Sequence, residues 1–135
     1  MRLVFVDTAG WMAMADESDP LHQDSKRLRD EHLERGGLLV TSDYVMDETL
    51  TLIRMRIGLE ATRTFQEQTA ESPRLRWERV DVRRFQAAME WFFRWKDKTF
   101  SFTDCTSFVI MRDLHVKKVL TCDRHFQEAG FEILL

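Results

Sequence analysis

Two short apolar runs, one near each end of the chain, stop abruptly at an aspartate. The first reads LVFVDTAGW over residues 3–11, and the second reads VLTCDRHF over residues 119–126. A run of four apolar residues with two valines is too short for a helix, so residues 3–6 are predicted to form a buried strand that ends before Asp7. Residues 118–121 are predicted to form another strand, before Asp123. Each predicted strand therefore carries an acid just beyond its carboxyl end.

The rest of the chain alternates between strand and helix patterns. Further strands are predicted at residues 38–40, 75–80 and 131–135. Helices are predicted through Trp11 and Met14 and over residues 20–35, 44–57, 59–71, 82–92, 103–114 and 124–129. Residues 75–80 alternate apolar and charged side chains, which suits an edge strand. This order favours an α/β fold with a five-stranded, mostly parallel sheet covered by helices on both faces.

Length and composition predict a single folded domain over residues 1–135. The chain has only five Gly and two Pro and no low-complexity run, so we expect no flexible linker. No stretch approaches the ~18 apolar residues that a membrane span needs, and Asp7 interrupts the apolar start. We therefore expect a cytoplasmic protein with no membrane contact. Cys105 and Cys122 are too few for a disulfide framework.

Three acids are candidates for one site. Asp7 and Asp123 follow predicted strands, and Asp104 lies at the start of a predicted helix in SFTDCTSF, residues 101–108. Ligands bind at the carboxyl ends of strands in parallel sheets. Each acid also has an ordinary structural explanation, because Asp7 or Thr8 and Asp123 suit N-cap positions and Ser101-x-x-Asp104 matches a capping box. Three converging carboxylates would nevertheless repel one another unless a cation lay between them.

Carboxylate oxygens are hard ligands, so the predicted cation is Mg²⁺ or Mn²⁺ rather than zinc. A fourth ligand is expected from Asp43, Asp47 or Glu48. Asp43 follows a strand but also suits a helix cap. Asp47 and Glu48 lie about 100° apart on a helix, so only one of them would face the crevice. The pattern leaves these three residues open, and it favours a structural role for His125.

With these residues identified, the chain resembles the PIN-domain family, and more narrowly the VapC-type toxins of bacterial toxin–antitoxin pairs. The resemblance runs nearly end to end and rests on four fragments in order: LVFVDTAGW with Asp7, SDYVMDETL with Glu48, FSFTDCTSF with Asp104 and LTCDRHF with Asp123. It implies a single PIN-like domain. It also selects Glu48, rather than Asp47 or Asp43, as the fourth acid.

The resemblance implies an Mg²⁺- or Mn²⁺-dependent endoribonuclease in which metal-activated water hydrolyses RNA phosphodiester bonds. It assigns catalysis and metal binding to Asp7, Glu48, Asp104 and Asp123, with Asp7 and Asp104 at the main ion. The implied partners are an RNA substrate, a second copy of the chain in a homodimer, and a cognate antitoxin that inserts a segment into the acidic crevice. The number of ions and the RNA target stay open.

The charge distribution suggests where RNA would bind. The formal net charge is −3, but residues 74–98 hold eight bases against four acids. We predict that this stretch and Arg124 contact RNA phosphates, with solvated helix faces as the alternative. Trp91 and Trp95 are interpreted as core or dimer residues rather than as a platform for bases.

Three alternative functions make different demands on the sequence. A phosphatase with an aspartate nucleophile needs a second aspartate two residues after the first, and Ala9 occupies that position. A binding module without activity would be expected to lack one or more of the acids, and all four are present. A PIN nuclease of RNA processing without an antitoxin is the third alternative, and the presence or absence of a short gene upstream would distinguish it.

Overall fold

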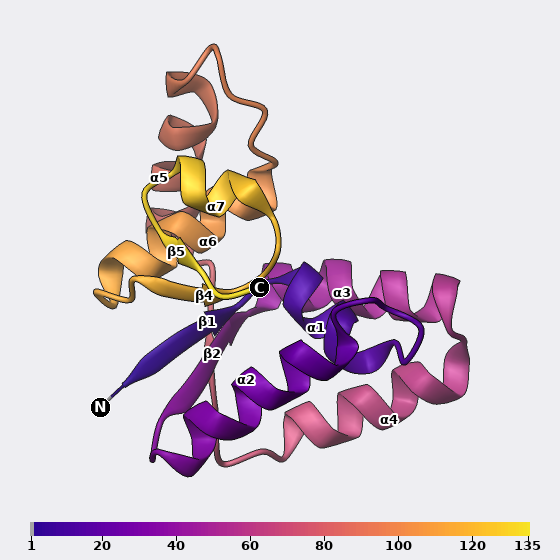
Figure 1. Cartoon of the computed structure of the whole chain (residues 1–135). Coiled ribbons are helices and arrows are strands. Elements are labelled where there is room, and N and C mark those ends of the chain that lie inside the picture. Colours follow the sequence, from indigo (N-terminus) through magenta and orange to yellow (C-terminus); the bar gives the residue numbers. More distant parts are fainter. Residues whose placement is uncertain (1) are drawn as a thin grey trace.

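The computed structural model describes residues 2–135 and contains one five-stranded sheet (Figure 1). The strands lie in the order β3-β2-β1-β4-β5, and every neighbouring pair is parallel. Their bounds are β1 (Leu3–Val6), β2 (Leu38–Ser42), β3 (Leu75–Glu78), β4 (Lys118–Leu120) and β5 (Glu132–Ile133). The predicted α/β fold with a parallel sheet is confirmed.

Helices cover the sheet in two groups (Figure 1). One group contains α1 (Thr8–Ala15), α2 (His22–Glu34), α3 (Asp43–Arg56) and α4 (Leu59–Ala70), and the other contains α5 (Val82–Arg94), α6 (Phe102–Asp113) and α7 (Arg124–Glu128). The prediction for α2 began too early, because Pro20 lies in a turn in which Asp19 Oδ1 accepts a hydrogen bond from the Leu21 amide at 2.8 Å. Within residues 2–135, no helix is long and apolar enough to span a membrane.

Strand ends differ from the predictions where local pairing decides them. β3 is an edge strand as predicted, but it ends at Glu78 rather than residue 80. β2 runs on to Ser42, because Thr41 and Ser42 pair with β3. β5 is shorter than predicted, although the Leu134 amide still donates to the Val119 carbonyl at 3.0 Å.

The core lies between the sheet and the helices and is built mainly around α6. Residues 104–111 of this helix are all buried, and Phe108 is completely buried. Trp91 of α5 packs against Phe108 with ring centroids 5.2 Å apart, which agrees with a core role. Trp95 is 43% exposed and is therefore not a core residue. On the other face, Gly10 allows α1 to approach β4 closely, because any side chain there would collide with the Leu120 carbonyl.

Candidate metal centre

A cleft opens at the carboxyl edge of the sheet, where α1, α6 and α7 begin and α3 passes alongside. All four acids selected from the sequence line it: Asp7, Glu48, Asp104 and Asp123. Its volume is about 480 Å³. A water molecule takes up roughly 30 Å³, so the cleft has room for a hydrated ion and a phosphate group. We call it the acidic cleft.

Asp7 is held in the cleft without acting as a helix cap. It occupies the N-cap position of α1, but its side chain makes no capping hydrogen bond. Its exposed fraction is only 4%, and its Oδ2 accepts a hydrogen bond from the Thr121 hydroxyl at 3.3 Å. A buried carboxylate is unfavourable unless it is paired or bound to a metal. The capping explanation is therefore wrong for Asp7.

Asp104 combines a structural contact with a place in the cleft. It forms the predicted capping box, in which its Oδ2 accepts from the Ser101 amide at 3.1 Å and its own amide donates to Ser101 Oγ at 3.0 Å. This box fixes the rotamer of a side chain that is only 6% exposed. Among the residues described, Oδ1 of Asp104 has no hydrogen-bond partner. That oxygen is free to bind a ligand.

Asp123 and His125 complete the far wall of the cleft. Asp123 caps α7 as predicted, with Oδ1 accepting from the His125 amide at 2.9 Å. The turn brings the imidazole back over the cap, so Nδ1 of His125 lies 3.2 Å from Asp104 Oδ2 and 3.3 Å from Asp123 Oδ1. The spacing D-x-H was the only sequence signal for this arrangement. His125 thus belongs to the site, whereas the sequence favoured a role in structure alone.

The possible metal ligands differ in part from the four predicted acids. Asp104, Asp123 and His125 each offer a ligand atom, and these atoms all lie within 4.8 Å of one another. Asp7 and Glu48 line the same cleft but stand outside this tight group. Two carboxylates with a third, buried carboxylate nearby are a ligand set for Mg²⁺ or Mn²⁺, and the imidazole suits the softer of these ions.

Burial and the neighbouring negative charges favour protonation of Asp7 and Asp104 in the absence of a cation. The pKa of Asp7 is raised from 3.8 to about 7, first by burial and then by the charges of Asp104, Asp123 and Glu48. The pKa of Asp104 is raised mainly by burial, with a further contribution from Asp123. Ionised carboxylates that repel one another in this way would be stabilised by a cation between them.

A family model for the PIN domain matches residues 4–132. The chain belongs to the PIN-domain family. The 23S rRNA-specific endonuclease VapC20 of Mycobacterium tuberculosis, found in two strains, is 33% identical over 129 residues, which cover 96% of this chain and 95% of the relative.

Solved structures agree with this assignment. The crystal structure of Mycobacterium tuberculosis VapC20, described as a sarcin–ricin loop cleaving toxin, has a TM-score of 0.88 and covers 95% of both chains at 33% identity. FitAcB from Neisseria gonorrhoeae has a TM-score of 0.69 and covers 98% of this chain and 96% of its own, but at 13% identity it supports the fold alone.

The geometry of this PIN domain separates the three candidates for the fourth acid. Glu48 lines the acidic cleft, whereas Asp43 and Asp47 do not. Oδ1 of Asp43 accepts hydrogen bonds from the amides of Tyr44 and Val80, both at 3.0 Å, and so ties the start of α3 to the segment before α5. Of these three acids, Glu48 is thus the one that lies in the acidic cleft, and its role as the fourth ligand stays a prediction.

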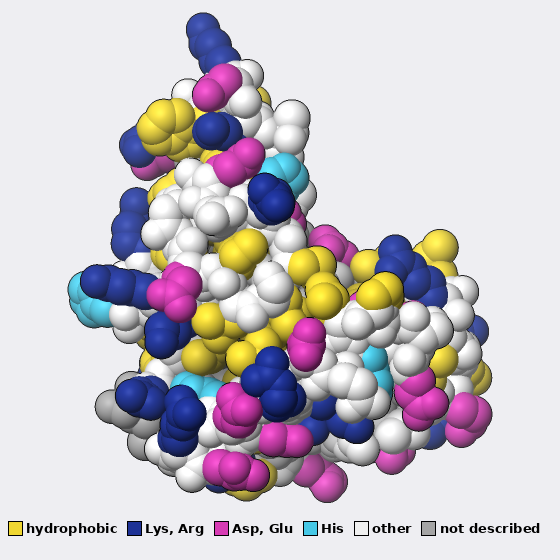
Figure 2. All heavy atoms as spheres, in the orientation of Figure 1, with side chains coloured by type: hydrophobic (Ala, Val, Ile, Leu, Met, Phe, Trp, Pro, Cys, Tyr) yellow, Lys and Arg dark blue, Asp and Glu magenta, His cyan; other side chains and the backbone are white. Residues whose placement is uncertain are grey.

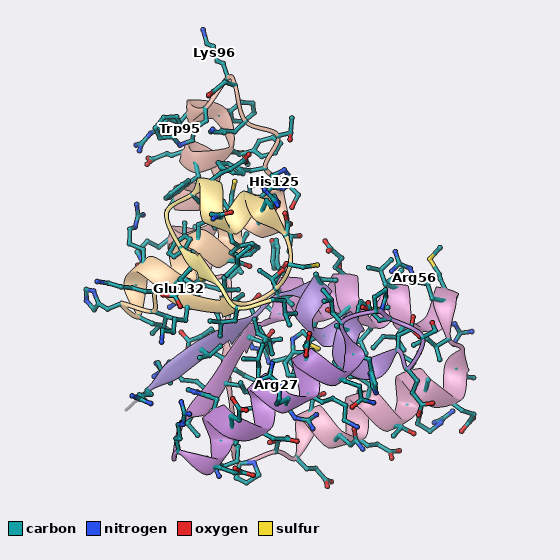
Figure 3. The ribbon with its side chains drawn as sticks, in the orientation of Figure 1. Arg27, Arg56, Trp95, Lys96, His125 and Glu132 are labelled. Atoms are coloured by element: carbon teal, nitrogen blue, oxygen red, sulfur yellow. The ribbon has the colours of Figure 1, made fainter. Side chains whose placement is uncertain are left out.

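The sequence did not point to Arg56, a basic residue that lines the acidic cleft. Arg56 lies two turns beyond Glu48 on α3, and Leu52 lies between them on the same face. Arg56 and His125 come from opposite sides of the cleft (Figure 3). The spacing of four residues along α3 was a signal for Arg56, but it could be read only once Glu48 was known to face the cleft.

Several bases of the stretch predicted to contact RNA make contacts within the PIN domain. Arg74 donates to the carbonyls of Leu33 and Gly37 at 2.6 and 2.8 Å. The stretch also forms ion pairs, which are Arg76 with Glu78, Arg83 with Asp113, Arg84 with both Glu78 and Asp113, and Lys98 with Asp97. Much of this charge therefore holds β3, α5 and α6 together.

Proposed function

We propose that this PIN-domain protein is a metal-dependent endoribonuclease that cleaves the sarcin–ricin loop of 23S rRNA and serves as the toxin of a type II toxin–antitoxin pair. The support is the identity of 33% to VapC20 over nearly the full length of both chains, together with the acidic cleft. Because ribosomal RNA is the target, the protein would act in the cytoplasm.

The buried position of Asp7 is the observation that carries the nuclease function. Folding does not need this carboxyl as a cap, and burial beside three other acids raises its pKa to about 7. A carboxyl kept at such a position is explained by a cation that binds it in the working enzyme. Asp7 and Asp104 are proposed to hold the main ion, and Glu48 and Asp123 to complete its shell or to position water.

A divalent ion bound here would supply a water of lowered pKa and would offset the charge that develops on the phosphate. The protein residues provide orientation. The Thr121 hydroxyl fixes Asp7, the Ser101 box fixes Asp104, and the His125 imidazole lies between the carboxylates of Asp104 and Asp123. These contacts keep the carboxylates in place before any ligand binds.

Arg56 is proposed to hold the RNA backbone in the acidic cleft. It is the single arginine or lysine among the described residues that line the cleft. Two helical turns from Glu48 to Arg56 correspond to about 12 Å along α3. This distance suits a phosphate that neighbours the scissile one, so the guanidinium would position substrate without touching the reacting bond.

Two protein partners are proposed on the basis of surface chemistry. The acidic cleft is complementary to a basic side chain, as expected for an antitoxin segment that occupies it. The outer face of α5 exposes Phe93 to 72% and Val82 to 74%, and Phe92 and Trp95 lie partly exposed nearby. An apolar surface of this kind suits the interface of a homodimer.

The proposed function is tested with a transcript of the sarcin–ricin loop, the purified protein, and Mg²⁺, Mn²⁺ or chelator. Cleavage is expected with metal, at one position, and is expected to disappear with chelator and in Asp104→Asn. Cleavage that survives both changes would refute the metal centre. Cleavage of many unrelated RNAs, with no antitoxin gene beside this one, would favour the RNA-processing alternative.

A further inference from the structure

A second cleft opens at the amino edge of the sheet, opposite the edge that carries the acidic cleft. It is bounded by the starts of β1 and β4, the C-terminal half of α2 and the turn that follows α6, and its volume is about 440 Å³. We call it the amino-edge cleft. Its charged lining residues are Arg2, Arg29, Glu31, Arg35, Lys117 and Lys118.

The amino-edge cleft has a strong excess of positive charge. It contains five arginine or lysine side chains against one acid. That acid, Glu31, is already paired with Arg27 at 3.3 Å, and Arg29 is paired with Asp30 at 2.9 Å. The other four bases, which are Arg2, Arg35, Lys117 and Lys118, form no ion pair within residues 2–135. Unneutralised charges that converge on one cleft attract a polyanion.

This surplus contrasts with the basic stretch of residues 74–98, in which several arginines are taken up by internal contacts. The amino-edge cleft collects its charge from segments far apart in the sequence, namely the residues before β1, the end of α2 and the start of β4. No run of basic residues in the sequence predicts this cleft. Because four of its bases form no ion pairs within residues 2–135, their charge is available to a ligand.

The floor between these bases is apolar. It includes Leu3, Val4, Leu28, Leu39 and Leu134. Figure 2 shows dark blue side chains above and below a yellow band on the left side of the molecule, near the N-terminal end of the chain. Basic rims with an apolar floor fit a nucleic-acid strand, because phosphates can meet the rims while sugars and bases cover the floor.

We propose that the amino-edge cleft binds the phosphate backbone of a folded RNA substrate at a point remote from the bond that is cleaved. The choice of RNA as the polyanion rests on the function proposed above. β1 has four residues, so the two edges of the sheet are separated by about 13 Å. A folded RNA extends far enough to reach both clefts at once.

The test compares two double charge reversals in the Asp104→Asn background with chelator, so that binding is measured without cleavage. Lys117→Glu with Lys118→Glu alters the amino-edge cleft. Lys26→Glu with Arg63→Glu makes the same change of charge on α2 and α4, outside both clefts. The probe is a sarcin–ricin loop transcript with a long flanking stem.

We expect the first pair to weaken binding of the long transcript at least ~10-fold and to reduce the slope of log K against log salt by about 1.4–1.8, because two phosphate contacts are lost. The control pair should weaken binding less than ~3-fold. If Lys117 and Lys118 cannot both be replaced without unfolding, exposed Arg35→Gln provides the same comparison.

Equal binding of the two double variants would overturn the inference while leaving the proposed cleavage untouched. If the wild-type protein cleaves no RNA but the first pair still loses affinity for the long transcript, the cleavage proposal fails and the inference stands.

Discussion

The Thr121 hydroxyl donates to Oδ2 of Asp7 at 3.3 Å, across 114 positions of the sequence. The contact follows from strand register: Val6 of β1 pairs with Leu120 of β4, so the next residue of each strand meets at the carboxyl edge. The same hydroxyl accepts the amide of Asp123 at 3.0 Å. One threonine therefore connects the acids that follow the two central strands, and it fixes the acidic cleft to the sheet.

Replacing Asp7 by Asn should separate activity from stability. We expect cleavage of the sarcin–ricin loop transcript to fall at least ~100-fold, because a carboxylate of the proposed metal site is lost. In chelator at pH 8 the Tm should rise, because a buried charge beside other carboxylates is removed. Asp47→Asn, an exposed change outside the cleft, is the control. A fall in the Tm of Asp7→Asn would show instead that the fold needs this carboxylate.

The stability of the metal-free protein should fall as the pH rises from about 4 to about 7. The pKa of Asp7 is raised from 3.8 to about 7, so between these values the folded protein holds a proton that the unfolded chain has released. Over this range the difference in bound protons removes up to ~4 kcal/mol from the free energy of unfolding, and above about pH 7 there is no further loss from Asp7. Asp113 acts in the opposite sense below this window, because its ion pairs with Arg83 and Arg84 lower its pKa. Chemical denaturation across the pH range measures the effect, and Asp7→Asn should flatten it.

Adding Mg²⁺ should reverse this loss. Metal ligands must be deprotonated, so binding is stronger at pH 8 than at pH 5, and binding to the folded state raises the Tm. We expect a clear Mg²⁺-dependent rise of the Tm at pH 8 and a small one at pH 5 in the wild-type protein. The same titration of Asp104→Asn should show little rise at either pH. A rise of equal size in that variant would place the ion elsewhere.

The sheet and the acids at its edge could be predicted because each depends on local sequence. Short apolar runs define β1 and β4, and an aspartate directly after a buried strand can only lie at the carboxyl edge. Helix capping was also local, and the Ser101 box was correctly predicted. The local pattern did not show, however, whether a residue at a cap position also belongs to the site. Asp104 caps a helix and also faces the cleft, whereas Asp7 lies at a cap position but makes no capping hydrogen bond.

The remaining features depend on how distant elements face one another. His125 reaches Asp104 only because α7 packs beside the start of α6. Arg56 enters the acidic cleft only because of the rotation of α3 about its axis. The ion pairs of Arg83 and Arg84 with Asp113 could not be predicted, because Asp113 becomes their neighbour only in the folded chain. Side-chain direction at long range is the information that a single sequence lacks.

Glu48→Gln should weaken the metal site, and its neighbour provides a matched control. Glu48 lines the acidic cleft and Asp47 does not, although both are exposed on α3. We expect Glu48→Gln to reduce Mg²⁺ affinity or cleavage ~10–100-fold, with Asp47→Asn near the wild-type value. Isothermal titration with Mg²⁺ and a cleavage assay over a range of Mg²⁺ concentrations measure the two effects. Equal behaviour of the two variants would remove Glu48 from the site.

Arg56→Ala should affect RNA binding and leave the metal site intact. The guanidinium lies in the cleft two turns from Glu48, and Arg54 lies in the same last turn of α3 but does not line the cleft. A charged hydrogen bond to phosphate contributes about 1.5–3 kcal/mol, so kcat/KM should fall at least ~10-fold in Arg56→Ala. Arg54→Ala should remain close to wild type. The effect should appear mainly in KM, with an unchanged rise of the Tm on adding Mg²⁺, because a residue that holds a neighbouring phosphate acts equally on bound substrate and transition state. An altered metal response in Arg56→Ala would show that the arginine acts on the carboxylates instead.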